Sequence, residues 1–132
     1  MSQNSKRLKL PPQAIDFEEA VLGAILIDKN AMAEVGDILS PEVFYKESHK
    51  EIFKATETLF QNAEPIDVMT VKNQLQLNKK LKLCGGAIYL AELTNKVISS
   101  ANIEYHSRII VQKHIQRELI STCSEIIQDS YD

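Results

Sequence analysis

The stretch LPPQAIDFEEAVLGAILIDKNAM, residues 10–32, decides the fold class, because its apolar run is either a buried strand or a helix buried on every side. Asp16 and Glu19 have the spacing of a capping box, in which the first side chain accepts a hydrogen bond from an unpaired backbone N–H. The pair predicts a helix start at Asp16, so AVLGAILI is predicted to be helical. A helix that is apolar around its whole girth belongs at the centre of a domain. Gly23 lowers helix stability by ~1 kcal/mol relative to alanine, which predicts that a neighbouring helix approaches closely there.

The composition limits the class of protein. A chain of 132 residues, 44% of them hydrophobic, is long enough for one domain with a hydrophobic core. Its formal net charge of -3 gives no global attraction to phosphate. No apolar run reaches the ~18 residues of a membrane span, and the basic start is not followed by the apolar segment of an export signal. Cys84 and Cys123 fit no metal or redox spacing, so we expect reduced thiols in a cytoplasmic protein.

Further capping residues predict helix starts at short intervals along the chain: Asn30, Ser40 before Pro41, Ser48 paired with Glu51, and Asp67. The glycines at 85–86 allow a tight turn into another helix, which we expect to direct four side chains inward: Ile88, Leu90, Leu93 and Val97. No strand pair or hairpin signal is present. We therefore predict an all-α fold with a disordered tail at 1–10, a compact multi-helix head at 11–98 and a long helix at 99–132.

This last helix is longer than the head that it grows from. About thirty residues without proline or glycine span roughly 45 Å, whereas a compact domain of about 100 residues is roughly 30–35 Å across. Its outer half carries an apolar stripe of Ile115, Leu119, Thr122 and Ile126, with Ile120, Cys123 and Ile127 beside it. Such a stripe needs a partner, so self-assembly is predicted along Ile115, Leu119 and Ile127. A following antiparallel helix in a longer chain, another subunit, and packing on the chain's own head remain open.

The sequence carries no recognisable signature of catalysis or cofactor binding. It contains no GxxxxGK[ST] segment to hold a phosphate, so no ATPase is expected in this piece. Neither HExxH nor an i, i+4 pair occurs among the histidines, His49, His106 and His114. No aromatic residue interleaves with the basic patch Lys79, Lys80 and Lys82, which favours a solvated loop over a DNA site. We expect no catalytic residue, cofactor or metal here.

Six segments follow one another at a characteristic spacing: PPQAIDFEEAVLGAIL, LSPEVFY, SHKEIFKA, EPIDVMTV, GGAIYLAEL and SANIEYHSRIIVQKHIQRELI. Together they resemble the N-terminal domain of the bacterial replicative DNA helicases of the DnaB family, over the chain from about Leu10 to its end. Two departures from the family pattern are small. KVISSAN lacks the proline that often precedes its serine or threonine, and Phe17 replaces a small or acidic residue.

The resemblance implies a role in DNA replication. Members of this family are hexameric rings whose C-terminal domain binds ATP and Mg²⁺ and makes most of the DNA contacts. Their N-terminal domains form a collar, a trimer of dimers, through a helical hairpin of which the long helix would be the first arm. The collar docks the C-terminal domain of primase, which couples unwinding to priming, and a helicase loader is a further implied partner. The implied primase-binding positions are Tyr89, Ile120 and Ile126.

Other interpretations stay open at this point. The helicase-binding C-terminal domain of primase has a similar fold, although AVLGAIL and GGAIYLAEL argue against it. A single-stranded DNA-binding module and a small helical enzyme or metal protein are more remote. Tyr89, Ile120 and Ile126 also fit ordinary core or hairpin packing. If Tyr89 is an exposed anchor, alanine there should weaken primase binding and leave the melting temperature nearly unchanged.

Overall fold

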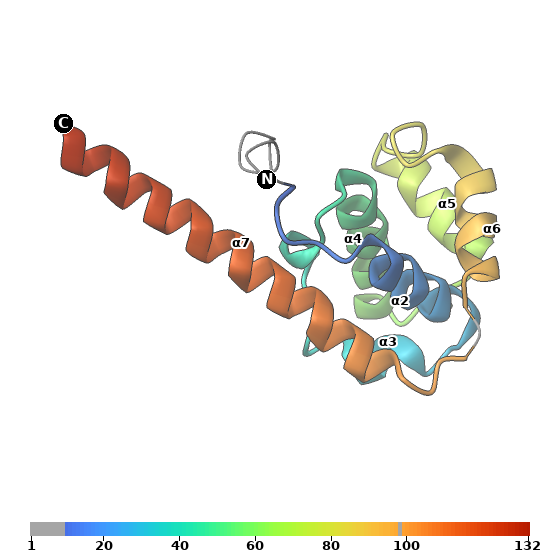
Figure 1. The fold of residues 1–132 in the computed structure, drawn as a ribbon. Helices are drawn as coiled ribbons and strands as arrows, with labels where there is room; N and C mark the ends of the chain where they lie inside the picture. Colours follow the sequence, from blue (N-terminus) through green and yellow to red (C-terminus); the bar gives the residue numbers. More distant parts are fainter. Residues whose placement is uncertain (1–9, 98) are drawn as a thin grey trace.

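The computed structural model describes residues 10–97 and 99–132, so all but the last residue of the predicted tail lies outside the described part. The described residues contain no strand, which confirms the all-α prediction. They form a head of helices from which one long helix extends (Figure 1). In order, the elements are α2 (Ile15–Ile27), α3 (Ala31–Val35), the 3-10 helix η1 (Pro41–Val43), α4 (Glu47–Gln61), α5 (Val68–Leu77), α6 (Gly86–Asn95) and α7 (Ile103–Tyr131).

Helix α2 is the central element, as predicted. Every residue from Val21 to Leu26 is buried, because α4, α6 and α7 pack around it. A Cβ added to Gly23 would lie 2.1 Å from the carbonyl oxygen of Leu93 in α6. The backbones of α2 and α6 therefore touch at this point, and the predicted close approach is confirmed.

Two predicted helix starts are wrong. Helix α2 begins at Ile15 behind Ala14, which makes no side-chain cap, so Asp16 is already inside the first turn and cannot act as the cap. Helix α4 likewise begins at Glu47 behind Lys46, and Ser48 is buried instead of capping. In both cases the helix begins one residue before the polar side chain that was predicted to cap it.

The start of α5 agrees with the sequence. Asp67 Oδ1 accepts a hydrogen bond from the Thr70 amide at 2.9 Å, and Thr70 Oγ1 accepts one from the Asp67 amide at 2.9 Å. In α6, Leu90 is buried as expected, but Ile88 is 75% exposed, so its predicted inward position is wrong. Two residues correspond to about 200° around a helix, which places Ile88 on the side away from Leu90.

The core joins side chains from every element of the head, with Phe44, Phe53, Leu22 and Ile25 among the largest that are fully buried. Helix α7 adds Ile103, Ser107 and Ile110 to this core, and these are its only buried residues. Within the part of the chain that the structure describes, no helix is long and apolar enough to cross a membrane.

Candidate functional site

The outer part of α7 projects from the head as a free helix, as predicted (Figure 1). Every residue from 118 to 132, here called the overhang, is exposed to solvent. Its large apolar side chains remain more than half exposed: Leu119 62%, Ile120 54%, Ile126 60% and Ile127 59%. Apolar side chains gathered in this way on a free helix are typical of a surface that binds another protein.

The exposed apolar stripe lies on the side of α7 that is turned away from the head. Ile110 is buried at 1% exposure, and Leu119 follows it by nine residues. Nine residues at about 100° each make roughly two and a half turns, so the two side chains point in opposite directions. Ile115, at the inner end of the stripe, is 58% exposed and lines an open hollow together with Asp37 and Ile38 of the head. A partner can therefore lie along the overhang without meeting the head.

Arg117 marks the place where α7 leaves the head. Its Nη1 donates a hydrogen bond to the Pro12 carbonyl at 2.7 Å, and its Nη2 donates one to the Val43 carbonyl at 2.9 Å. Its guanidinium carbon lies 5.3 Å from the centre of the Tyr45 ring, within the range of a cation–π interaction. No feature of the sequence indicates this role, because the partners are backbone carbonyls far away in the chain.

A buried polar network connects α2, α4 and α6 behind the surface of the head. Glu18 and His49 are 1% and 0% exposed, and Glu18 Oε1 lies 2.7 Å from His49 Nδ1. The other carboxylate oxygen, Oε2, accepts a hydrogen bond from the Tyr45 amide at 2.7 Å. On its far side, His49 Nε2 lies 2.6 Å from the hydroxyl of Tyr89. Each buried polar atom of this chain of contacts thus has a partner, as a low-dielectric interior requires.

The direction of the hydrogen bonds follows from the groups involved. An ionised Glu18 carboxylate can only accept, so His49 Nδ1 donates to it. His49 Nε2 then accepts from the Tyr89 hydroxyl when the ring is neutral and donates to it when the ring is charged. Burial, followed by the negative charges of Glu19 and Glu18, raises the pKa of Tyr89 to about 12, so its hydroxyl keeps the proton at neutral pH.

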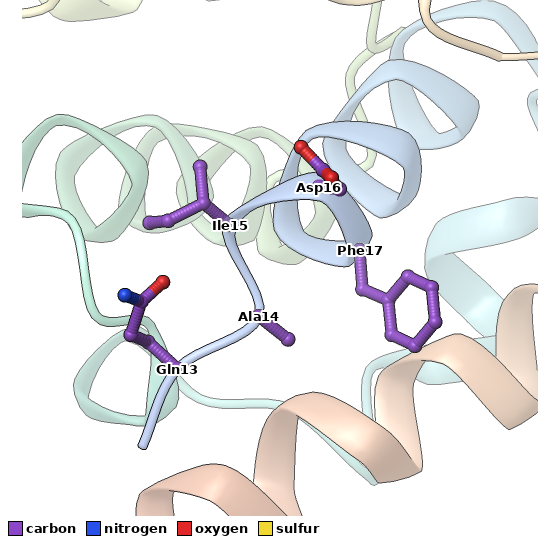
Figure 2. Close-up of a pocket in the computed structure, with 5 residues that line it drawn as sticks. All are labelled: Gln13, Ala14, Ile15, Asp16 and Phe17. Atoms are coloured by element: carbon purple, nitrogen blue, oxygen red, sulfur yellow. The ribbon is translucent and has the colours of Figure 1, made fainter. Parts of the chain in front are cut away.

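A shallow open hollow of about 400 Å³ lies at the start of α2 and is lined by Gln13, Ala14, Ile15, Asp16 and Phe17 (Figure 2). Figure 2 shows Phe17 directed toward α7, where its ring stacks on His106 with centres 4.9 Å apart. Asp16 is its only ionisable side chain, so the hollow lacks a paired acid and base. Among the residues that the structure describes, no group of three or more His, Cys, Asp or Glu side chains could hold a metal ion.

The family model described as "DnaB-like helicase N terminal domain" matches residues 10–112. The chain is also 42% identical, over 123 residues, to the protein named replicative DNA helicase DnaB of Geobacillus stearothermophilus. The chain belongs to the DnaB N-terminal domain family. This membership decides against the primase-domain alternative. The aligned residues are 93% of this chain and 27% of that relative, so the chain spans about a quarter of its length.

Solved structures of DnaB N-terminal domains have the same fold. The N-terminal domain of the DnaB helicase from Mycobacterium tuberculosis superimposes with a TM-score of 0.90 at 34% identity, covering 92% of this chain and 87% of that one. A DnaB-like replicative helicase, solved in a study of its interactions with primase, gives a TM-score of 0.76 at 28% identity. That match covers 88% of this chain and 27% of the other.

The structure separates the three residues that the DnaB resemblance assigned to primase. Ile120 and Ile126 are exposed on the overhang, whereas Tyr89 lies on α6, on the other side of the head (Figure 1). Tyr89 is half-buried, and its hydroxyl is bonded to His49 inside the head. The expectation that alanine at Tyr89 leaves the melting temperature unchanged is therefore revised, since the substitution would strand a buried histidine nitrogen.

Glu18 and His49 were not singled out from the sequence, although a signal for them exists. Glu18 is in helical phase with the buried Leu22 and Ile25, and His49 with the buried Phe53. Polar residues in phase with a buried apolar stripe must find partners inside the protein. Two such residues in one chain, of opposite potential charge, could have been predicted to meet.

Proposed function

We propose that this chain is the assembly and docking segment of a replicative DNA helicase, and that it acts by burying apolar helix surface without making or breaking bonds. The observation that carries the proposal is the apolar stripe of α7, which is exposed and turned away from the head. The names of the relatives support the helicase context. The study of a DnaB-like helicase with primase supports a primase as the docking partner.

The size of the stripe indicates how much assembly it can drive alone. Its five largest side chains are each a little over half exposed: Ile115, Leu119, Ile120, Ile126 and Ile127. Burying the remainder of each contributes about 1 kcal/mol, or roughly 5 kcal/mol in all. Association costs about 4–15 kcal/mol in lost freedom of motion. We therefore expect this chain alone to be a monomer or weak dimer, and the second arm of a hairpin to strengthen assembly into a trimer-of-dimers collar on a hexameric ring.

We assign the ATP and Mg²⁺ of such a helicase to its C-terminal domain, together with most of the DNA contacts. The residues of this segment do not suit a nucleotide phosphate. The Gly85–Gly86 turn has no lysine after it, and its amides already donate to the carbonyls of Lys82 and Leu81. A helicase loader and a cytoplasmic location belong to the same proposal.

Assembly is tested in the full-length helicase by sedimentation velocity. Leu119→Glu places a negative charge in the stripe, and we expect it to lower the fraction of hexamer. Gln128→Glu is the matched control, since it adds the same charge to an exposed position of α7 about 180° around the helix from Leu119. The assembly role is refuted if both variants form hexamers as the wild type does.

Docking is tested by calorimetric titration of this chain with the C-terminal domain of primase. Both Ile120→Ala and Ile126→Ala should weaken binding, because each removes an exposed apolar anchor. Gln128→Ala provides the control, because this exposed polar residue of the overhang lies about 160° around the helix from Ile126. Equal affinity for all four proteins would show that primase does not use this part of α7.

A further inference from the structure

Tyr89 is held from inside the head by a chain of short contacts that begins in a different helix. The Tyr45 amide fixes one oxygen of Glu18, the other oxygen lies 2.7 Å from His49 Nδ1, and His49 Nε2 lies 2.6 Å from the Tyr89 hydroxyl. We propose that Glu18 and His49 are positioning residues, which hold the ring of Tyr89 in one orientation so that its outer face is presented to a protein partner. This inference rests on the proposed docking function and adds to it the residues that prepare the contact.

A contribution to stability alone does not account for the pair. A buried polar or ionic pair is often no more stabilising than apolar residues of the same volume, because both groups lose their hydration. What the Glu18–His49 pair adds is a fixed orientation for the Tyr89 ring. Both oxygens of Glu18 are engaged, so its carboxylate plane is fixed, and this fixes the imidazole plane of His49. Since the Tyr89 hydroxyl bonds the remaining nitrogen, the tyrosine ring has one favoured orientation, with its plane 12° from that of the imidazole.

The surroundings of the ring point to the same role. Lys46 follows Tyr45 directly, and its ammonium lies 4.9 Å from the centre of the Tyr89 ring. Glu18 therefore holds, through the Tyr45 amide, the segment that carries this cation as well as the histidine that binds the hydroxyl. Gly85 makes room for the tyrosine, since a Cβ at that position would lie only 2.9 Å from the Cβ of Tyr89. Its outer face remains accessible, since Tyr89 is half-buried.

The test separates orientation from stability. Glu18→Gln keeps the shape of the side chain and removes the charge. His49→Asn keeps a donor for Glu18 but removes the nitrogen that binds Tyr89, and it serves if Glu18→Gln does not fold. Thr56→Val is the matched control, since Thr56 is a fully buried residue of α4 whose hydroxyl donates to the Phe53 carbonyl at 2.7 Å and does not touch the network.

The readout is NMR of the chain labelled with ¹³C in its tyrosine rings. The Tyr89 signals are assigned by their loss in Tyr89→Phe. We expect Glu18→Gln and His49→Asn to move them toward the position of the exposed Tyr131, and to weaken binding of the primase C-terminal domain by about tenfold. Thr56→Val should change neither the Tyr89 signals nor the affinity at a temperature where every variant is folded.

Three outcomes contradict different parts of the reasoning. Unshifted Tyr89 signals in Glu18→Gln or His49→Asn overturn the positioning role. Shifted signals with wild-type affinity overturn the use of that position for docking. If Tyr89→Ala, which removes the ring, binds primase as the wild type does, then Tyr89 is not a docking residue, and it is the proposed function at this position that fails.

Discussion

Replacing Gly23 by alanine should destabilise the head, although alanine is the better helix former. The added methyl carbon would lie 2.1 Å from the Leu93 carbonyl oxygen and 2.5 Å from Val97 Cγ2. The nearest obstacle is backbone, which cannot rotate out of the way. Helix α6 must therefore move away from α2 by more than about 1 Å, and the packing of the buried Leu90 and Leu93 is loosened with it.

The two opposing contributions can be weighed. Alanine gains about 1 kcal/mol from its higher helix propensity. Overpacking of a tight core costs typically 1–3 kcal/mol, and we expect about 3 because the clash is with a carbonyl group. The net loss in the free energy of unfolding is then about 2 kcal/mol, which lowers the melting temperature of a domain of this size by roughly 6–10 °C.

Unfolding by heat and by urea, followed by circular dichroism at fixed protein concentration, measures this loss. Gly36→Ala is the control, because Gly36 has the helical φ of −59° and an added Cβ would only come within 3.0 Å of the Met32 carbonyl. Its melting temperature should stay within a few degrees of wild type, since the gain in propensity offsets a mild contact. A Gly23→Ala protein that melts at or above the wild-type temperature would refute the close contact between α2 and α6.

Three further predictions concern single side chains. Arg117→Ala removes two hydrogen bonds to backbone carbonyls and should lower the free energy of unfolding by about 1–3 kcal/mol. Amide hydrogen exchange of the residues next to Pro12 should become faster, and unchanged exchange there contradicts the anchoring role. Iodoacetamide at pH 8 should modify the exposed Cys123 and spare the buried Cys84, whose pKa burial raises to about 11, and equal rates by mass spectrometry contradict this. Because the folded-state pKa values of Cys84 and Tyr89 lie above their unfolded values of 9.0 and 10.0, the contribution of these two groups to stability should be constant below about pH 9 and should fall as pH rises toward 12. Tyr89→Phe should lessen that fall above pH 10, and a parallel curve for the variant would refute the assignment.

The parts of the fold that were predictable from sequence are those fixed by local chemistry. Asp67 and Thr70 complete a capping box within four residues, so no distant contact is needed to form it. The run around Gly23 is apolar on all sides, and only a central helix can bury it. A glycine in that setting has few explanations other than a close neighbour, which the structure supplies in α6.

The parts that were not predictable depend on which distant residues meet. A carboxylate near a helix start is expected to interact with the helix end, so the sequence predicts Asp16 as the capping residue. Glu18 lies two residues further on, about 200° around the helix, so its side chain points into the core and contacts the buried His49. The helical period shows that Asp16 and Glu18 point in different directions. Only the tertiary structure shows that the buried group contacting Glu18 is His49. The same limit applies to Tyr89, whose half-buried position follows from its bond to His49.

Helix α7 shows how one sequence pattern can serve two separate purposes. Isoleucines and leucines occur on both sides of this helix, so periodicity alone cannot say which side its own head covers. The side with Ile103 and Ile110 packs against the head, and Arg117 donates hydrogen bonds to head carbonyls where this contact ends. On the other side, Ile115 and Leu119 are exposed. Ile110 and Leu119 are nine residues apart and point to opposite sides of the helix, so the effects of substituting them should add independently. Substitutions at Ile110 should then change the melting temperature of the chain. Leu119→Glu should instead change assembly and leave the melting temperature unchanged. A large loss of stability in Leu119→Glu would mean that the outer stripe is part of the folded core.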